Sequence, residues 1–428
     1  MPVYAMRAIT TFAVMATLIA AGCGGSGDSD TAASTTNTQP ASTRIDGVLA
    51  LGHLAPLTGP LAVLSPSLTV PVQMAVAEIN AAGGVGGAPV TLFVADDGSV
   101  PETGRTALKK LVATDHVDAV IGPASSNVAL ELLSDVKSAP VLQCSGSNTA
   151  ASLSDTDSGG FYFRTSPSDN LQAVALASLL LHDRRASPAF IVRNDTYGVG
   201  LARAATRVLR EAGISPKPTV SYDPEGTDFT QDVEKIAASK PDSVVVLGLQ
   251  EDGARILNGM IAAGIGPSGM PIYGTDGIGS SAFAAIVDSA NPGVVAGVRG
   301  TTPASTPAGI DHPFNVAIAT SGVDNIYSSY YYDCAILTAL AAVRAKSDDP
   351  VKMQRAFAKN LTGNTLCKTF AECKSALESG KAIHYQGASS DFKVWDGHEP
   401  GVGRYDIWWY DSAGRLTTAP PSEQITVP

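Results

Sequence analysis

Polar side chains that could hold a small charged molecule follow three apolar segments of the chain. Ser126 lies just beyond the first segment, Ser147 and Thr149 lie just beyond the second, and Asp276 directly follows the third. Hydroxyls combined with the free backbone amides of a helix N-terminus suit a carboxylate, whereas an aspartate suits a cation. If the fold brings these groups together, they would form a receptor for a zwitterion.

Each group also has an ordinary structural explanation. Serine and threonine are common helix caps, and Asp276 stands before Gly277 in a sequence that is typical of a turn. The choice between a binding site and local capping therefore depends on where the strands end in space. Open α/β sheets bind ligands at the carboxyl ends of their strands, which favours the binding interpretation.

The sequence contains no complete motif of a known type of active site. A Gly-x-Ser-x-Gly nucleophile elbow is absent, and the six histidines are scattered without a pair spaced four residues apart. We therefore predict no catalytic residue, no metal ligand set and no cofactor. A net charge of −11 also argues against nucleic acid as a partner, since no basic stripe is present.

The N-terminus has the pattern of an export signal. Arg7 precedes an apolar run over 9–20, and Ala21-Gly22-Cys23 follows. The segment resembles a bacterial lipoprotein signal, in which Cys23 is lipidated and becomes the mature N-terminus, although Ala20 stands where leucine is usual. We predict a signal peptide over 1–22 and a disordered tether over 23–44, rich in Ser, Thr and Gly. An ordinary secreted protein is the alternative.

Four cysteines remain after Cys23, an even number in a compartment that permits disulfides. Cys367 and Cys373 are close enough in sequence to close a small loop, which leaves Cys144 and Cys334 to pair over a long separation. Metal binding is the alternative, but no Cys-x-x-Cys and no neighbouring histidine supports it.

From residue 45 the chain alternates between short apolar runs and helical patterns, which is typical of βαβ units with parallel sheets buried on both faces. A folded part of roughly 385 residues is too long for one hydrophobic core, so two α/β domains are expected. No segment after the N-terminal one has 18 uninterrupted apolar residues. The expected strands cover 47–54, 89–95, 118–122, 140–143, 189–192, 220–222, 243–249 and 271–273; the expected helices cover 70–82, 104–114, 127–137, 201–212, 229–238 and 253–263.

Five motifs occur in the same order as in a known family. They are Leu57-Thr-Gly-Pro60, Ala77-Glu-Ile-Asn-Ala-Ala-Gly-Gly-Val-Gly-Gly87, Val120-Ile-Gly-Pro-Ala-Ser-Ser126, Phe163-Arg-Thr-Ser166 and Tyr197-Gly-Val-Gly200. The chain resembles the extracytoplasmic solute-binding proteins of ABC importers, in the class that includes the leucine/isoleucine/valine-binding proteins. The resemblance implies two Rossmann-like α/β lobes with parallel sheets, joined by three crossovers around a ligand cleft. We place lobe 1 at 45–168 plus 299–400, and lobe 2 at 169–298 plus 401–428.

The resemblance also implies roles for individual residues. The contacts to a ligand α-carboxylate fall on Ser126, Ser147 and Thr149, and Thr149 would also help hold an ammonium group. Asp276 matches the carboxylate that neutralises the ammonium, where glutamate is common. 

Three further positions follow from the same resemblance. Gln250 stands where the family has a tyrosine that packs on the ammonium, Leu64 falls on a wall that is often tryptophan, and Tyr197 lies on the side of the second lobe.

The function implied is a lipid-anchored, monomeric binding protein outside the cytoplasm. It would capture a small polar solute, such as an amino acid (branched-chain ones included) or a related amide or carboxylate, and deliver it to the permease subunits of an ABC importer. The alternative is an extracytoplasmic sensing module that signals ligand binding to a membrane partner, because the same fold serves both purposes.

Overall fold

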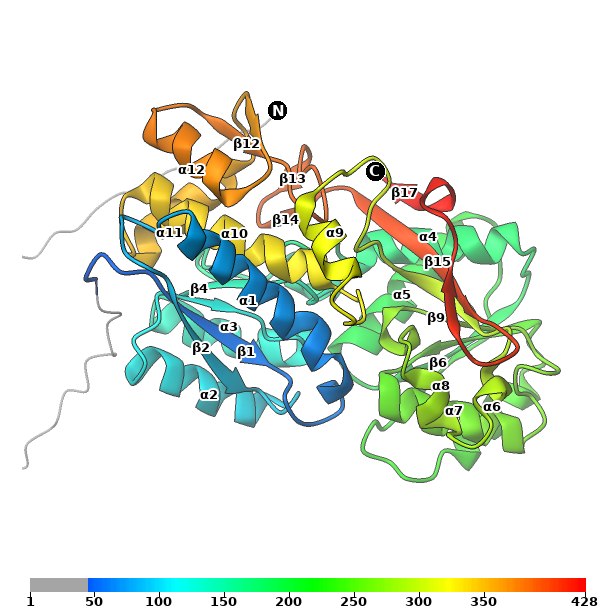
Figure 1. Cartoon of the computed structure of the whole chain (residues 1–428). Helices are drawn as coiled ribbons and strands as arrows, with labels where there is room; N and C mark the ends of the chain where they lie inside the picture. The colour runs from blue at the N-terminus through cyan, green and yellow to red at the C-terminus, as the bar shows by residue number, and fades with distance from the viewer. Residues whose placement is uncertain (1–44) are drawn as a thin grey trace, which may run out of the picture. The chain divides into compact units, whose positions relative to one another are not determined.

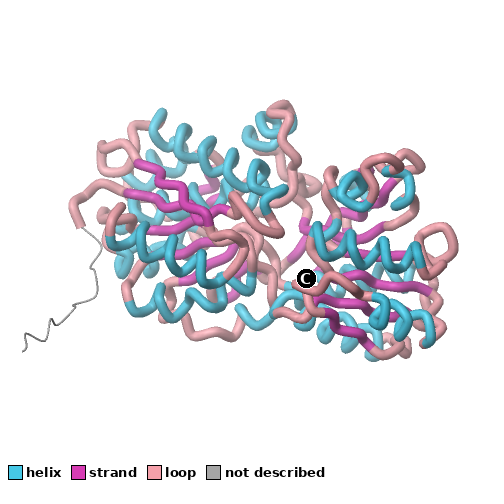
Figure 2. The backbone as a smooth tube through the Cα atoms, turned by 90° about the horizontal axis from the view of Figure 1, so that it is seen from below, coloured by secondary structure: helices cyan, strands magenta, loops and turns pink. Residues whose placement is uncertain are grey.

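The computed structural model describes residues 45–428, and in this part the chain forms two α/β lobes, each with a central sheet between layers of helices (Figures 1 and 2). The predicted signal peptide over 1–22, the tether over 23–44 and the lipidation site Cys23 lie outside the described residues.

The sheet of the first lobe is entirely parallel, as the alternating pattern predicts. Two helices lie side by side over one face of the sheet and two others cover the opposite face (Figure 1). The strand order is β2 (Thr91–Asp96), β1 (Ala50–Ala55), β3 (Ala119–Ile121), β4 (Leu142–Ser145) and β5 (Tyr162–Arg164). The helices are α1 (Ser65–Ala81) and α10 (Ser328–Ala345) on one face, and α2 (Pro101–Ala113) and α3 (Ser126–Ser138) on the other.

The sheet of the second lobe has eight strands and is mixed. Its first part is parallel, but the three C-terminal strands run antiparallel, which the βαβ pattern did not predict. The strand order is β16 (Leu416–Thr418), β15 (Gly403–Tyr410), β10 (Arg299–Pro303), β9 (Ile272–Gly274), β8 (Ser243–Leu247), β6 (Pro188–Arg193) and β7 (Thr219–Tyr222), with β17 (Ile425–Val427) paired to β15.

Helices also cover both faces of this second sheet. Every residue of the adjacent strands β6 and β8 is buried, as expected for strands inside a parallel sheet. One face carries α4 (Asp169–His182) and α5 (Thr196–Glu211), and the other carries α6 (Thr230–Ala238), α7 (Gln250–Ala262) and α8 (Phe283–Val287).

Three segments of the chain cross between the lobes, at 165–168, 304–312 and 401–402. The second crossing differs from the predicted boundary at residue 299. Strand β10 (Arg299–Pro303) pairs with β9 and β15 in the second sheet, so the chain returns to the first lobe only after Pro303. The sequence of this strand, Arg-Gly-Thr-Thr-Pro, does not indicate which sheet it joins, and only the pairing decides its place.

The first lobe also carries a small elaboration after α10. It contains α11 (Pro350–Phe357), β11 (Thr365–Cys367), α12 (Phe370–Glu378), β12 (Ile383–Tyr385), β13 (Trp395–Asp396) and β14 (Glu399–Pro400), and α9 (Pro313–Ala319) precedes α10. Short 3-10 helices are η1 (Ala62–Leu64), η2 (Ala151–Leu153), η3 (Asp276–Ile278), η4 (Pro292–Val295), η5 (Ala358–Asn360) and η6 (Pro421–Glu423).

Both predicted disulfides are present. Cys144 of β4 is bonded to Cys334 of α10, so the bond joins a central strand to the helix that covers it. Cys367 and Cys373 close a small loop between β11 and α12. Both bonds therefore lie in the first lobe.

Helix α1 begins at Ser65, earlier than predicted, and the reason is proline. Pro66 occupies the first turn, where a missing backbone N–H costs nothing, and Pro71 is tolerated inside the helix. Among the described residues, the helical stretch Ala62–Ala81 is long and apolar enough to cross a membrane by length and composition. Its apolar side, including Leu68 and Val72, is buried in the core against α10, which explains its composition.

Candidate functional site

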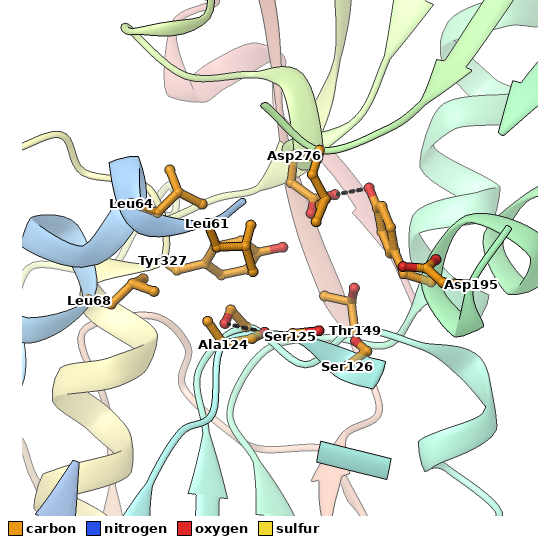
Figure 3. Close-up of a pocket in the computed structure, with 14 residues that line it drawn as sticks. Leu61, Leu64, Leu68, Ala124, Ser125, Ser126, Thr149, Asp195, Asp276 and Tyr327 are labelled. Carbon is orange, nitrogen blue, oxygen red and sulfur yellow. Dashed lines mark hydrogen bonds between the residues drawn. The ribbon is translucent and has the colours of Figure 1, made fainter. Parts of the chain in front are cut away.

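A cavity lies between the two lobes at the carboxyl ends of their strands (Figure 3). The first lobe contributes a polar wall of Ala124, Ser125, Ser126, Ser147 and Thr149. The second lobe contributes Asp195, Tyr197, Leu249, Asp276 and Gly277. Leu61, Leu64, Leu68 and Tyr327 complete the lining.

The N-terminus of α3 forms the centre of the first-lobe wall. Ser125 is the N-cap and accepts a hydrogen bond from the backbone N–H of Val128 (3.4 Å). Ser126 begins the helix, and its Oγ accepts from the N–H of Ala150 (3.2 Å). Because that oxygen acts as an acceptor, the hydroxyl proton of Ser126 remains available to donate to a ligand oxygen. The helix N-terminus adds partial positive charge.

The loop after β4 holds the other two predicted carboxylate contacts in place. The Oγ of Ser147 donates to the carbonyl of Ala124 (3.1 Å) and lies 3.0 Å from the hydroxyl of Tyr331. Asn148 ties the same loop to the carbonyls of Pro123 and Ala124 at 3.0 and 2.9 Å. Thr149 is 1% exposed and lines the cavity beside them. The structure thus brings Ser126, Ser147 and Thr149 together, with the first lobe supporting each one.

Asp276 faces this wall from the second lobe, at the end of β9. Its Oδ1 accepts hydrogen bonds from Nε2 of Gln172 (2.7 Å) and from the hydroxyl of Tyr197 (3.4 Å). Burial raises the pKa of Asp276, and these donors counteract the rise. The loop after Asp276 needs glycine at 277, because a Cβ there would lie 2.1 Å from the carbonyl oxygen of Gly248.

A second carboxylate lies beneath Asp276. Asp169 is fully buried, and burial together with the charge of Asp276 raises its pKa well above the usual value. No described Lys or Arg side chain forms an ion pair with Asp169 or Asp276 within 4.0 Å. Asp276 therefore faces the cavity without a cationic protein partner, and its carboxylate suits a cationic group of a ligand.

Tyr197 lines the second-lobe side, where the resemblance places it, but its hydroxyl is engaged. That hydroxyl lies 2.7 Å from Oγ1 of Thr275. Asp195 also lines the cavity, and it caps α5 by accepting from the N–H of Gly198 (2.9 Å). Nε of Arg193 donates to the other oxygen of Asp195 at 2.6 Å. The charge of Asp195 is therefore already balanced by protein groups.

Gln250 is not part of the cavity lining, contrary to our prediction. Its Nε2 donates to the carbonyl of Gly277 (2.8 Å) and its Oε1 accepts from Ser280 (2.5 Å). The preceding residue, Leu249, lines the cavity instead. At the start of α7 consecutive side chains point in different directions, so a shift of one residue exchanges an amide for an apolar contact.

The apolar part of the lining consists of Leu61, Leu64 and Leu68 together with Leu249. Sequence reasoning missed Leu249, Asp195 and Tyr327. Asp195 could have been found as a helix cap before Thr196-Tyr-Gly. Tyr327 gave no such signal, because α10 behind it is buried on nearly all sides and has no polar face that would mark its orientation.

The fold and the cavity together define a two-lobed binding protein. Among residues 45–428, no group of three or more His, Cys, Asp or Glu side chains is arranged to hold a metal ion. The profile of a family described as "Periplasmic binding protein" matches residues 48–384. The chain therefore belongs to the periplasmic binding protein family, and its architecture is that of the type I members.

The chain is also similar to individual known proteins, in sequence or in structure. The chain is 32% identical over 251 residues to the Leu/Ile/Val-binding protein BraC3 of Rhizobium johnstonii. The aligned residues make up 58% of this chain and 66% of BraC3, so the match spans just under two thirds of that protein's length. The leucine-binding protein LivK of Thermotoga maritima superposes with a TM-score of 0.72 at 18% identity, covering 89% of this chain and 99% of LivK. An R. palustris ABC-transporter solute-binding protein in complex with benzoate superposes with a TM-score of 0.67 at 17% identity, covering 87% and 95%.

Proposed function

We propose that this protein is the solute-binding component of an ABC importer and that it binds a small zwitterion, an amino acid or a close derivative, by closure of its two lobes. The observation that carries the proposal is that the two lobes contribute different polar groups to the cleft. Hydroxyl and amide donors come from the first lobe, and the unbalanced carboxylate Asp276 comes from the second. A ligand with a carboxylate and an ammonium group complements both walls only when they face each other.

Contacts across the cleft support closure as the mechanism. Oγ1 of Thr196 in the second lobe lies 3.3 Å from Oδ1 of Asn127 in the first. On another part of the interface, the N–H of Ser281 donates to Asp324 at 3.1 Å. Bound ligand would add its own hydrogen bonds to these few direct contacts. Micromolar affinity corresponds to about −8 kcal/mol, which a few charge-assisted hydrogen bonds in a desolvated cleft can supply.

The ligand class follows from the lining together with the named relatives. The leucine side chains at positions 61, 64, 68 and 249 suit an apolar ligand side chain. The relatives named above are leucine- or Leu/Ile/Val-binding proteins, and one solved neighbour holds the simple carboxylate benzoate. We favour an amino acid because a simple carboxylate would leave Asp276 without a cationic partner. Calorimetric titration with amino acids, their amides and matching organic acids tests this choice, and preferential binding of the organic acids would refute it.

We further propose that Cys23 carries the lipid that holds the protein at the membrane surface. Residues 24–49 separate Cys23 from the first strand, so the fold should not depend on the anchor. Cys23→Ala should release the protein from washed membranes without changing ligand affinity. Retention of this variant in the membrane fraction, with the signal peptide cleaved as judged by N-terminal mass, would contradict the lipoprotein assignment.

Transport can be tested separately from binding. Deleting the gene should abolish high-affinity uptake of the radiolabelled ligand, and the Cys23→Ala protein should restore uptake only in part, because it is no longer concentrated at the membrane. Normal uptake in the deletion strain, accompanied by loss of a transcriptional response to the ligand, would instead indicate a sensing module.

A further inference from the structure

We propose that the hydroxyl of Tyr327 is a ligand contact that accepts a hydrogen bond from the ammonium group of the bound amino acid while its own proton points toward Asp276. Tyr327 would thereby select ligands with a cationic N–H group over matching carboxylates that lack one. This inference rests on the proposed function, because it concerns the same cavity and the same class of ligand.

The backbone places Tyr327 in an unusual conformation. It is the residue before α10, with φ 60° and ψ 2°, in the left-handed region that bulky residues rarely adopt. The side chain is only 4% exposed, and its hydroxyl points into the cavity between Asp276 and Thr149 (Figure 3). Unfavourable backbone conformations of this kind are concentrated at binding and active sites, where the surrounding structure holds a side chain in position.

The hydroxyl of Tyr327 is buried, and it forms no hydrogen bond of ordinary geometry, although it interacts with the carboxylate of Asp276 as an acceptor. Other lining hydroxyls each form at least one hydrogen bond of ordinary geometry within the protein: Ser126 accepts from Ala150, Ser147 donates to Ala124, and Tyr197 pairs with Thr275. No described group donates a hydrogen bond to this buried oxygen, and an unsatisfied buried acceptor is destabilising, so its presence calls for an explanation. A donor on a ligand in the cavity would be the missing partner.

The charges around this hydroxyl determine which ligand atom suits it. Asp276, Tyr197 and Asp169 are the titratable groups whose interactions reach it, and none of them is a cation. Burial first, and then the negative charge of Asp276, raise the pKa of Tyr327 well above its usual value, so the hydroxyl keeps its proton. With that proton directed toward the carboxylate, the oxygen lone pairs face the cavity and suit an N–H donor.

The position of Tyr327 also compensates for a missing polar group in the second lobe. Leu249 is the second-lobe residue at the cavity beside Gly277, and its side chain offers no hydrogen bond. Tyr327 belongs to the core of the first lobe, whereas Asp276 belongs to the second. The two side chains therefore meet around the ligand ammonium only in the closed arrangement.

The test compares amino acids with their deaminated counterparts. Wild type, Tyr327→Phe and Tyr332→Phe are titrated calorimetrically with L-leucine and 4-methylpentanoate, and with L-phenylalanine and 3-phenylpropanoate. Tyr332 is a matched control, because it is a buried tyrosine of the adjoining helix α10 whose hydroxyl donates to Glu78 outside the cavity. Thermal unfolding of all three proteins shows whether each variant is folded.

Tyr327→Phe should weaken binding of the amino acids by about 10- to 100-fold, the effect of losing a hydrogen bond to a charged group. Binding of the deaminated acids should change by less than about threefold. The ratio of the affinity for each amino acid to the affinity for its deaminated counterpart should therefore fall. Tyr332→Phe should keep the wild-type preference even if its melting temperature falls.

Two results would overturn the inference about Tyr327 alone: an unchanged preference in Tyr327→Phe, or an equal loss of affinity for both members of a pair. Failure of wild type to bind any amino acid more tightly than its deaminated partner would instead refute the amino-acid assignment, and the role of Tyr327 with it.

Discussion

The two walls of the cleft differ both in chemistry and in how firmly each is held. The first-lobe wall consists of neutral donors whose supporting hydrogen bonds stay within that lobe, as in the loop 145–149 that Asn148 ties to Pro123 and Ala124. The second-lobe wall presents carboxylates, and Asp276 is held by single contacts from Gln172 and Tyr197. One wall is therefore a prearranged anion site, and the other is a source of negative charge.

The disulfides add to this difference in rigidity between the two lobes. Both described disulfides lie in the first lobe, and Cys144–Cys334 joins the strand before loop 145–149 to the helix after Tyr327. The second lobe contains no cysteine. Preorganisation lowers the cost of ordering the site on binding. We infer that the ligand carboxylate docks first on the rigid lobe, and that the second lobe then closes over the ammonium.

The largest predicted effect tests the charge on the second wall. Asp276→Ala should weaken binding of L-leucine by about 3–5 kcal/mol, because a buried ammonium group would lose its counter-charge. That corresponds to a loss of roughly a hundred-fold to several thousand-fold in affinity by calorimetry. Binding of 4-methylpentanoate should not weaken. Unchanged leucine affinity in Asp276→Ala would show that Asp276 does not balance the charge of the ligand ammonium group.

The next effect tests the rigidity of the first wall. Replacing Cys144 and Cys334 together with alanine should lower the free energy of unfolding by about 2–5 kcal/mol, measured by denaturant titration. Replacing Cys367 and Cys373 should cost less, since their sequence separation is 6 residues rather than 190. Reduction of the wild-type disulfides provides the control. Equal unfolding free energies for wild type and both double variants would show that the disulfides do not make the first lobe more stable.

A smaller effect tests the donors of the first wall. Ser126→Ala and Thr149→Ala each remove a hydrogen bond to a charged carboxylate and should cost about 1.5–3 kcal/mol of binding free energy. In contrast to Asp276→Ala, these variants should lose affinity for L-leucine and for 4-methylpentanoate to a similar extent. A loss confined to the amino acid would place the ammonium, rather than the carboxylate, on the first lobe.

The smallest effect concerns a carboxylate behind the first wall. Burial raises the pKa of Asp97 from 3.8 to about 6, although backbone donors at Ser99 and Ala124 counteract it. Between these two values only the folded state keeps the proton, so Asp97 makes stability fall as pH rises. From pH 5 to pH 7 its contribution should be about 1–2 kcal/mol.

Asp97→Asn provides the comparison, because asparagine can still accept the hydrogen bond from Ser99 (2.7 Å). Unfolding free energies of wild type and variant at several pH values should differ in slope between pH 5 and pH 6. Parallel curves would show that Asp97 does not titrate in this range.

The sequence predicted much of this arrangement because its signals are local. Short apolar runs between helical patterns indicate parallel strands, and β3, β6 and β8 lie where those runs occur. Ser126, Thr149 and Asp276 could be singled out because polar residues directly after buried strands must lie at one edge of a sheet. The cysteine spacing likewise indicated the pairing that the structure contains.

Other features depend on contacts between distant parts of the chain, and only the tertiary structure decided them. The pairing of β10 with β9 and β15 places this strand in the second lobe, whereas the sequence led us to place it in the first. The start of α7 decided that Leu249, rather than Gln250, reaches the cavity. Tyr327 enters the site because one left-handed residue turns its ring toward a carboxylate of the opposite lobe. Amino-acid type and spacing determine which groups are available, whereas the direction of each side chain depends on the packing of both lobes.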